Sequence, residues 1–526
     1  MPNYLSPGVY VREVEAGSRP IEGVGTAVAA FVGFANQGPS RPTLVTNWTK
    51  FTELYGDFVE GGYLAHAVYG YFANGGGAAY IVRVGEDGSS NGGGGADKGR
   101  GQQPRQVPAR QGTLGGYKIV ELAPGEAKGD ITVEVQPATR PPASEGEQAP
   151  APPDDVFKLV VKRGNKVEET FDHVSTKRGK ENVVTAVKQG SKLIGIEELP
   201  GAGTLSSAEP ASVTLAPPPA TPARIEAGDY VGDTAERTGF SGLEAVDEVT
   251  MVAVPDLMSA YQRGAIDLNG VQAVQQAIIT HCELMGDRVA ILDPPPGLGA
   301  QQVKEWRRDK AGYDSKYATL YYPWIEVFDP VSGKNAAIPP SGHVAGIWAR
   351  NDDTRGVHKA PANEVVRGVL ELETRLTKPE HDLLNPLGIN CIRAFPGRGI
   401  RIWGARTLSS DPAWRYLNVR RLFNYLEESI LNGTQWVVFE PNDDALWARI
   451  RRTISAFLVN EWRKGALFGL TPDEAFYVKC DRETNPAEGI DAGQVVCQVG
   501  VAPVKPAEFV IFELAQFSGG TSLVTE

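Results

Sequence analysis

The hydrophobic pattern of this chain changes its period many times. Short apolar runs that suit buried strands alternate with segments whose apolar residues recur every three or four positions, as in amphipathic helices. Outside the middle of the chain, the predicted strands are Val24–Phe34, Ala78–Val84, Val249–Val254, Arg288–Asp293, Tyr317–Pro323 and Val365–Leu372. The predicted helices are Asn47–Tyr55, Leu64–Phe72, Val271–Met285, Val303–Lys310, Pro340–Arg350 and Pro379–Leu384. This alternation predicts an α/β (α+β) multi-domain fold with a mixed sheet.

Residues 388–467 carry the strongest local signals. Two apolar runs, Ile389–Phe395 and Ile400–Gly404, flank a Pro-Gly turn and predict a hairpin. Helical spacing predicts a helix over Leu417–Leu431, and the apolar run Trp436–Phe439 predicts a short buried strand. We therefore expect an α/β arrangement near the C-terminus as well.

A further helix is predicted to begin after Asn442, a favourable N-cap residue, and to run to about Lys464. Beyond it, Ala475–Cys480 and Gln494–Val501 predict an antiparallel strand pair. The C-terminal third is thus expected to form a folded unit rather than a tail.

The middle of the chain has a different composition. Residues 86–116 are rich in Gly, Ser, Gln and Arg and predict a flexible linker, and two Pro/Ala-rich loops follow. Short elements lie between these segments: predicted strands at Tyr117–Leu122, Ile131–Gln136, Val156–Arg163 and Val167–Phe171, and a predicted helix at Glu181–Lys188. The pattern indicates a small β-rich domain inserted into the α/β core.

These patterns divide the chain into five predicted parts. They are an extended arm at 1–20, an α/β domain made of 21–85 with 239–375, an inserted β-rich domain at 86–238, a C-terminal α/β domain at 376–506, and a C-terminal strand arm at 507–526.

Both ends of the chain are strand-like. Residues 1–15 are predicted to be extended, and Glu508–Gln516 is predicted to be a last strand between two others, because it is apolar on both faces. Each arm has two possible partners, a sheet of its own chain or the sheet of a neighbouring subunit. The candidate pairing residues are Val9, Tyr10, Val11, Val14, Phe509, Ile511, Phe512 and Leu514.

The composition argues against several classes of protein. A net charge of −12 over 526 residues argues against a nucleic-acid-binding protein as a whole. Four dispersed cysteines without a CxxC motif are typical of reduced, buried thiols in a cytosolic protein. The first residues lack the basic and apolar regions of a secretion signal, and no apolar run reaches the roughly 18–20 residues that span a bilayer.

The sequence contains no pattern that predicts catalysis, a metal site or a cofactor site. The acidic pairs Glu427-Glu428 and Asp443-Asp444 are adjacent in sequence, so their side chains do not face each other on a helix. The histidines show no HxxxH or HExxH spacing, and neither GxSxG nor a Walker A motif occurs. The glycine run after Asn74 follows a helix and precedes a strand, the reverse of a phosphate-binding loop. We expect no enzymatic activity.

Several motifs, in order along the chain, resemble the phage tail sheath family. They are LSPGVYVREVE, AFVGFANQGP, WTKFTELYGDF, GGGAAYIVRV, DRVAILDPP, GINCIRAFPGRGIRIWGARTLSSDPAWRYLNVRRLFNYLEESI and NDDALWARIRRTISAFLVNEWRKGALFG. The resemblance covers residues 1–85 and 240–526 and leaves out the inserted segment. It extends to the sheaths of phage-like contractile injection systems.

The resemblance implies a structural subunit that performs no covalent chemistry. Such subunits stack as rings around an inner tube and re-pack into a shorter, wider helix, which drives the tube through a target envelope. The implied partners are copies of the chain itself, an inner-tube protein, and baseplate and terminal cap proteins, without nucleic-acid contact or membrane insertion by the sheath. Terminal arms join the sheets of neighbouring subunits. The implied location is a phage tail or tail-like particle assembled in the cytoplasm of the producing cell.

The predicted helix that ends near Lys464 is basic in an otherwise acidic protein. Its cationic residues are Arg449, Arg451, Arg452, Arg463 and Lys464. They suit contact with an acidic tube surface, and the family pattern, in which a helix of the C-terminal domain lines the bore, favours this interpretation. The alternative is that basic residues late in a helix complement its dipole and stay solvated.

The inserted domain leaves a second function open. The chain would then be a non-contractile adhesin or binding protein with the β-rich domain as its recognition unit. The contrary interpretation of the insertion is a solvated decoration on the outer wall of a sheath.

Overall fold

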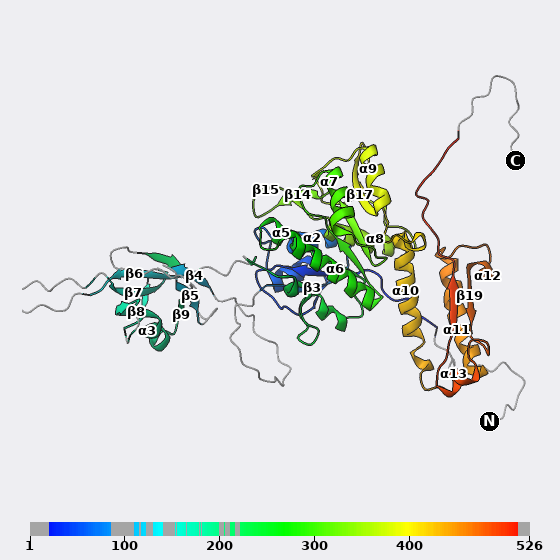
Figure 1. The fold of residues 1–526 in the computed structure, drawn as a ribbon, viewed down its shortest axis with the longest axis horizontal. Helices are drawn as coiled ribbons and strands as arrows, with labels where there is room; N and C mark the ends of the chain where they lie inside the picture. Colours follow the sequence, from blue (N-terminus) through cyan, green and yellow to red (C-terminus); the bar gives the residue numbers. More distant parts are fainter. Residues whose placement is uncertain are drawn as a thin grey trace, which may run out of the picture.

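The structure is a computed structural model of the chain (Figure 1). It describes residues 20–85, 110–114, 117–122, 130–139, 153, 155–164, 166–177, 179, 181–198, 205, 211–215, 221, 222 and 224–513. A central body lies between a small β-rich unit and a C-terminal unit dominated by two long helices (Figure 1).

The central body is built on an eight-stranded sheet of order β18-β17-β13-β12-β11-β1-β3-β2. Its strands are β1 (Val28–Gly33), β2 (Thr43–Val45), β3 (Ala78–Arg83), β11 (Met251–Ala253), β12 (Val289–Leu292), β13 (Ala318–Tyr322), β17 (Ile389–Phe395) and β18 (Gly399–Ile402). The six inner strands are parallel, and β2 and β18 are antiparallel edges. Strands covered on both faces explain the continuous apolar runs in the sequence.

Helices cover both faces of this sheet (Figure 1). They are α1 (Trp48–Tyr55), α2 (Leu64–Ala73), α4 (Ala227–Val231), α5 (Asp256–Gln262), α6 (Leu268–Met285), α7 (Ala300–Glu305), α8 (Ser341–Arg355) and α9 (Lys378–Leu384). Along β1, Phe31 packs into the core that includes α2 and α8, and Val32 packs into the core that includes α5 and α6. This alternation follows from the period of two in a strand.

A three-stranded sheet of β14 (Ile325–Asp329), β15 (Lys334–Ile338) and β16 (Glu371–Leu372) adjoins the body. The predicted strand Val365–Leu372 is wrong except for its last two residues. Its first part lies along the edge strand β18, where Val366 N donates to Ile400 O at 3.0 Å. The predicted helix Val303–Lys310 is α7 followed by a π-helical turn, Trp306–Ala311.

The inserted segment has two antiparallel sheets of order β10-β6-β7-β8 and β4-β5-β9. Its elements are β4 (Gln111–Leu114), β5 (Tyr117–Glu121), β6 (Ile131–Pro137), β7 (Val156–Arg163), β8 (Lys166–Ser175), α3 (Val183–Gly190), β9 (Ile194–Glu198) and β10 (Ser212–Thr214). They enclose a hydrophobic core separate from that of the body. Two boundaries differ from the prediction: β4 lies within the predicted linker, and Ile225 and Tyr230 belong to the core of the body although the predicted insertion extended to 238.

The C-terminal unit contains α10 (Leu417–Gly433), α11 (Asp444–Arg463), α12 (Pro472–Ala475), β19 (Phe476–Lys479), α13 (Ala487–Asp491) and β20 (Gln498–Val501). The predicted hairpin of β17 and β18 and the predicted pair of β19 and β20 are both confirmed. However, β17 and β18 extend the large sheet, so the predicted domain boundary at 376 falls inside the central body.

Two predictions for the loop between α10 and α11 are wrong. The predicted buried strand Trp436–Phe439 is a 3-10 turn, and Phe439 is fully exposed with a left-handed φ of 68°, which a strand does not allow. The N-cap of α11 is Asp443, which accepts from Leu446 N at 2.8 Å. Asn442 instead joins this loop to Gln494 O at 2.9 Å.

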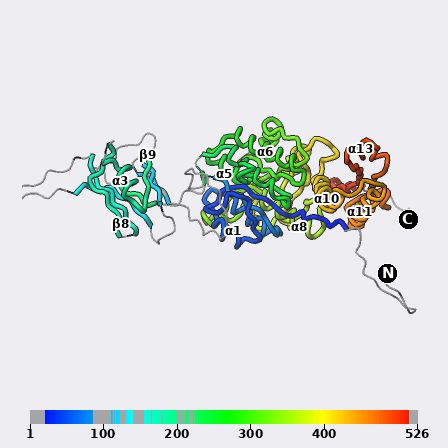
Figure 2. The backbone as a smooth tube through the Cα atoms, turned by 90° about the horizontal axis from the view of Figure 1, so that it is seen from below, coloured from blue at the N-terminus to red at the C-terminus, as the bar shows by residue number. Residues whose placement is uncertain are grey.

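Residues 20–27, here called the N-terminal strap, connect the central body with α10 (Figure 2). Val24 N donates to Ser429 Oγ at 3.1 Å. Gly23 lies so close to α10 that a Cβ atom there would be 2.0 Å from the Tyr425 hydroxyl. A side chain at position 23 would displace the Tyr425 ring, so glycine lets the strap pack directly against α10.

A buried ion pair holds the same junction. The Arg421 guanidinium donates to both carboxylate oxygens of Asp352 at 2.9 and 2.5 Å, and the two side chains are 3% and 4% exposed. The Thr26 hydroxyl donates to the same carboxylate at 2.6 Å. One pair therefore ties together α8, α10 and the N-terminal strap.

Candidate functional site: assembly surfaces

The crevice in which doubly wound folds hold ligands is filled by the chain itself. The chain leaves β1 for β3 on one side and later returns to β11 on the other, so the topological switch point lies at the carboxyl ends of β1 and β11. Asp256 lies there fully buried and accepts hydrogen bonds from the backbone N–H groups of Phe34 at 2.6 Å, Leu64 at 3.1 Å and Tyr63. Its carboxylate occupies the N-terminus of α2, where a ligand anion would otherwise bind.

Two buried carboxyl groups at this edge of the sheet have raised pKa values. Burial raises the pKa of Asp256 to about 6, although its three N–H donors oppose the shift. Burial likewise raises the pKa of Asp293 to about 7, opposed by donation from Ser341 N at 3.1 Å and Ser341 Oγ at 2.6 Å. Both carboxyl groups accept hydrogen bonds from residues at the ends of helices and strands, and both are buried away from solvent.

No three His, Cys, Asp or Glu side chains of the described residues converge to hold a metal ion. No helix in the same part of the chain is long and apolar enough to cross a membrane. A cavity of about 380 Å³ lies between the N-terminal strap, α10 and the amino ends of the parallel strands. Arg421 in its wall is already paired with Asp352.

The structure separates the five basic residues predicted on α11 into two groups. Arg449 pairs with Glu440 at 2.7 Å and stacks over Trp436, with its guanidinium 5.1 Å from the ring centroid. Arg451 donates to Cys480 O, and Lys464 pairs with Glu461 at 2.7 Å. These three cations are used inside the C-terminal unit.

The other two, Arg452 and Arg463, are exposed and have no hydrogen-bond or ion-pair partner among the residues that the structure describes. They are eleven residues apart, which is close to three helical turns, so they lie on one face of α11 roughly 16 Å apart. The opposite face buries Ile450, Ile454 and Phe457. The exposed face of α11 is therefore a cationic surface with two guanidinium groups that have no partner among the described residues.

The end of the described chain is held to the central body by Glu508, a contact that the sequence did not reveal. Arg406 donates to both of its carboxylate oxygens at 2.8 and 2.7 Å, Asn385 donates at 2.9 Å and the Tyr416 hydroxyl at 3.1 Å. Burial alone raises the pKa of Glu508, but the donors from Arg406 and Asn385 outweigh it and hold that pKa below its ordinary value. The only signal in the sequence was a single acid directly before an apolar run.

That apolar run lies in solvent. Phe509, Val510, Ile511 and Phe512 are 67–84% exposed and belong to no strand of the chain. The described part of this predicted strand, 508–513, pairs with no strand among the described residues of its own chain, and its pairing with a neighbouring subunit stays a prediction. Leu514 and the N-terminal residues Val9, Tyr10, Val11 and Val14 lie outside the described residues.

The small sheet of the C-terminal unit has open edges. Among the described residues, β19 and β20 pair only with each other, so the outer edge of each strand keeps unpaired N–H and C=O groups. Tyr477 on β19 is 61% exposed. An open edge of this kind accepts an additional strand.

A doubly wound body with a filled crevice, an exposed apolar terminal segment and open sheet edges defines a structural assembly protein. Residues 227–408 match the family model for the phage tail sheath protein central domain, and residues 409–517 match that for the phage tail sheath C-terminal domain. The chain belongs to the phage tail sheath protein family.

Relatives and solved structures agree with this assignment. The tail sheath protein of Vibrio phage KVP40 is 26% identical over 286 residues, covering 52% of this chain and 40% of the relative. That of Enterobacteria phage T4 is 22% identical over 406 residues, covering 70% and 57%. The chain thus spans about half the length of the curated relatives it matches.

Two solved sheaths share the fold over nearly the whole chain. The helical sheath of the anti-feeding prophage in its contracted state has a TM-score of 0.58 and 23% identity, covering 97% of this chain and 99% of that one. The sheath of the extracellular contractile injection system PVC, also contracted, has a TM-score of 0.55 and 22% identity, covering 98% and 99%.

Proposed function

We propose that this chain is the structural subunit of a contractile sheath, which polymerises around an inner tube and contracts to drive the tube through a target envelope. The observation that carries the proposal is the C-terminal segment, which leaves the Glu508 contact with four exposed apolar residues. Such a segment is an aggregation hazard in a monomer and a connector in a polymer. Membership of the sheath family supports the second role.

The connections between subunits are made by strand addition. The C-terminal arm, beginning at Phe509, and the N-terminal arm around Val9–Val14 pair with the open edges of β19 and β20 in neighbouring subunits. Each ladder hydrogen bond contributes about 0.5–1.5 kcal/mol net, and each fully buried apolar side chain contributes about 1.5–3 kcal/mol. Repeated in every subunit, these contributions decide whether a long polymer forms.

The inner tube is bound by the exposed face of α11. Arg452 and Arg463 are the residues that meet carboxylates of the tube, because the other basic residues of the helix already have partners. Charge complementarity of this kind fixes register and partner choice more than affinity. The Arg449, Arg451 and Lys464 side chains act by stabilising the C-terminal unit.

Contraction in this account is a change between two packings of one lattice. The central body and the C-terminal unit move as a block because the Arg421–Asp352 pair and the N-terminal strap join them, while the strand-paired arms keep subunits connected. The particle is a phage tail or tail-like device assembled in the cytoplasm of the producing cell, with baseplate and terminal cap proteins as further partners.

Negative-stain electron microscopy of the chain co-expressed with its inner-tube protein tests the proposal. Hollow, striated cylinders that shorten and widen after a chaotropic or acidic trigger are the expected result. A monomer that never forms cylinders at any protein concentration would contradict it.

A further inference from the structure

The hairpin of β17 and β18 carries a preformed basic surface away from α11. We call Arg393, Arg398 and Arg401 the hairpin arginines. The Arg393 and Arg398 guanidinium groups lie 5.4 and 5.6 Å from the centroid of the Phe395 ring, and Arg398 also lies 5.8 Å from that of Trp403. The two rings pack against each other with centroids 4.5 Å apart. These contacts fix long side chains that would otherwise be mobile, so less entropy is lost when they bind.

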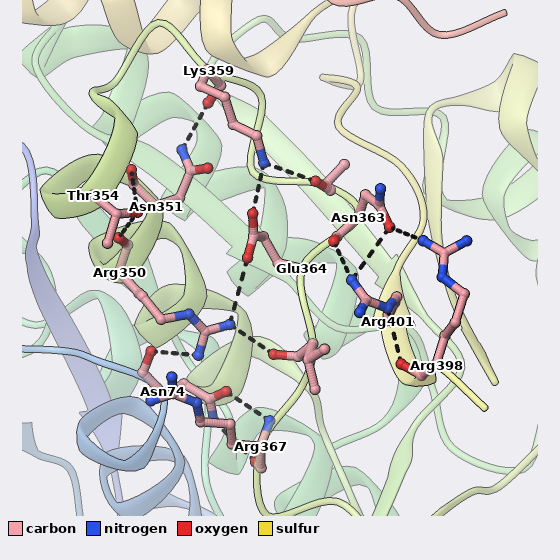
Figure 3. A network of polar contacts seen from close by, with 12 residues as sticks. Asn74, Arg350, Asn351, Thr354, Lys359, Asn363, Glu364, Arg367, Arg398 and Arg401 are labelled. Carbon is pink, nitrogen blue, oxygen red and sulfur yellow. Dashed lines mark hydrogen bonds and ion pairs between the residues drawn. The ribbon is translucent and has the colours of Figure 1, made fainter. Parts of the chain in front are cut away.

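Two of the hairpin arginines share a neutral acceptor (Figure 3). Arg398 donates to Asn363 Oδ1 at 2.9 Å, and Arg401 donates to the same atom at 3.4 Å and to Asn363 O at 2.7 Å. Asn363 holds this position with a left-handed φ of 60°, which asparagine and aspartate tolerate better than most residues. An amide therefore stands where a carboxylate would have neutralised the pair.

No carboxylate of the described residues forms an ion pair with a hairpin arginine, and two acids of the surrounding segments have other partners. Glu364 pairs with Lys359 at 2.7 Å and reaches Arg350 at 4.0 Å (Figure 3). Glu508 is bound by Arg406. The Nε atom of Arg393 is buried and has no hydrogen-bond partner among the residues that the structure describes. An acidic protein thus keeps several uncompensated cations together on one hairpin.

We propose that the hairpin arginines are a docking surface for carboxylates of a second copy of this chain, an inter-subunit contact separate from the strand-paired arms. Planar guanidinium groups bind carboxylates with two parallel hydrogen bonds. The chain carries a net charge of −12, so a second copy is a partner of opposite charge for this basic surface. A contact between two different surfaces of identical subunits repeats into a helix rather than closing into a dimer. The inference rests on the proposed sheath function.

Asn363→Asp tests this surface with the smallest change in shape. The new carboxylate pairs with Arg398 and Arg401 inside the chain and so competes with the carboxylates of a second copy. The isolated chain should therefore melt at the same or a higher temperature. Binding to an acidic neighbour should weaken about fivefold, the size expected for losing one exposed ion pair. Arg398→Gln should weaken it similarly, and Lys50→Gln, an exposed lysine on α1, is the control of equal charge change.

Sedimentation and electron microscopy of the full chain at low and high salt give the readout. We expect a higher concentration threshold for cylinders in Asn363→Asp and Arg398→Gln, a smaller salt dependence than in the wild type, and no change in Lys50→Gln. Wild-type assembly by both hairpin variants would overturn the proposal. It would also be overturned if the hairpin variants assembled normally and had lost binding to the inner tube or to polyanions instead. If the wild type forms no cylinders, the proposed function fails by itself. Salt-sensitive self-association in that case, lost in Asn363→Asp, would still support the docking surface.

Discussion

The crevice of the central body and the C-terminal region differ in where their polar and apolar groups find partners. At the carboxyl edge of the central sheet, Asp256 and Asp293 satisfy neighbouring backbone and side-chain donors inside the protein. In the C-terminal unit and the segment that follows it, Arg452 and Arg463 have no partner in the described chain, and Phe509 and Phe512 lie in solvent. The carboxyl groups at the crevice of the body are bonded within the chain. The C-terminal region, like the hairpin arginines at the edge of the sheet, instead has groups that remain available to other molecules.

This contrast shows why the fold class alone does not indicate function. An open parallel sheet usually binds ligands at its switch point, yet here a carboxylate of the chain occupies that position. The surfaces that explain the function lie on elements that a fold description treats as peripheral. The sharpest tests therefore compare changes inside the body with changes on those surfaces.

The largest effect is expected from breaking the buried junction between the two regions. Asp352→Ala leaves the Arg421 guanidinium buried without its counter-ion, which should cost about 3–5 kcal/mol of unfolding free energy. Urea denaturation of the full chain measures this loss of unfolding free energy. Asp353→Ala, which changes an exposed neighbour, is the control. Equal stability of the two variants would mean that the pair does not hold the junction.

A smaller, pH-dependent effect is expected at the filled crevice. The folded pKa of Asp256, about 6, lies above its ordinary value of 3.8, so the folded state binds the proton more tightly than the unfolded state. The stabilisation of the folded state by protonated Asp256 is fully present below about pH 4 and is lost as pH rises through 6. Relative to Asp256→Asn, the wild type should lose about 2–2.5 kcal/mol of unfolding free energy between pH 4 and pH 7. A difference between the two proteins that does not change with pH would contradict the raised pKa.

On α11, changes at the two groups of basic residues should separate stability from binding. Reversing Arg452 and Arg463 to Glu should reduce the fraction of extended sheaths that contain a tube several-fold without changing the melting temperature. Reversing Arg449 and Arg451 should instead lower the melting temperature, because both have partners inside the unit. Microscopy and calorimetry distinguish the two outcomes. Normal tube loading after reversal of Arg452 and Arg463 would favour the alternative in which these residues only complement the helix dipole.

The smallest effect is expected from removing the insertion. Deleting residues 86–222 and joining the ends with a short Gly/Ser linker should leave assembly unchanged, because this segment has its own core. A deletion through residue 237 should destabilise the chain, since it removes Ile225 and Tyr230 from the core of the body. Failure of the shorter deletion to make cylinders would show that the inserted domain contributes to the lattice.

The elements predicted most accurately are those with their own local signal. The turn before β18, the apolar runs of the parallel strands and the helical spacing of α10 each depend on a few adjacent residues. The wrong predictions are apolar runs whose surroundings decide their structure. Trp436–Phe439 forms a turn because two long helices must be joined there, and the start of Val365–Leu372 follows the edge of β18 without becoming a regular strand.

The candidate surfaces were only partly predictable for the same reason. The sequence identified the basic residues of α11 but not which of them have partners, because Glu440 lies in the preceding loop and Cys480 is 29 residues from Arg451. The hairpin arginines were not predicted, because Asn363 lies 35 residues from Arg398. Contacts between distant segments decide which charges remain available to a partner.

Deletion of the C-terminal arm tests the central claim most directly. A chain that ends at residue 508 keeps the Glu508 contact and loses the exposed segment that begins at Phe509, and the matched chain that ends at 513 keeps both. Circular dichroism, thermal melting and electron microscopy should show that the chain ending at 508 is folded but forms no cylinders, as should a chain lacking residues 2–15. Intact cylinders from the chain ending at 508, or an unfolded monomer from both arm deletions, would contradict the account in which the arms connect neighbouring subunits.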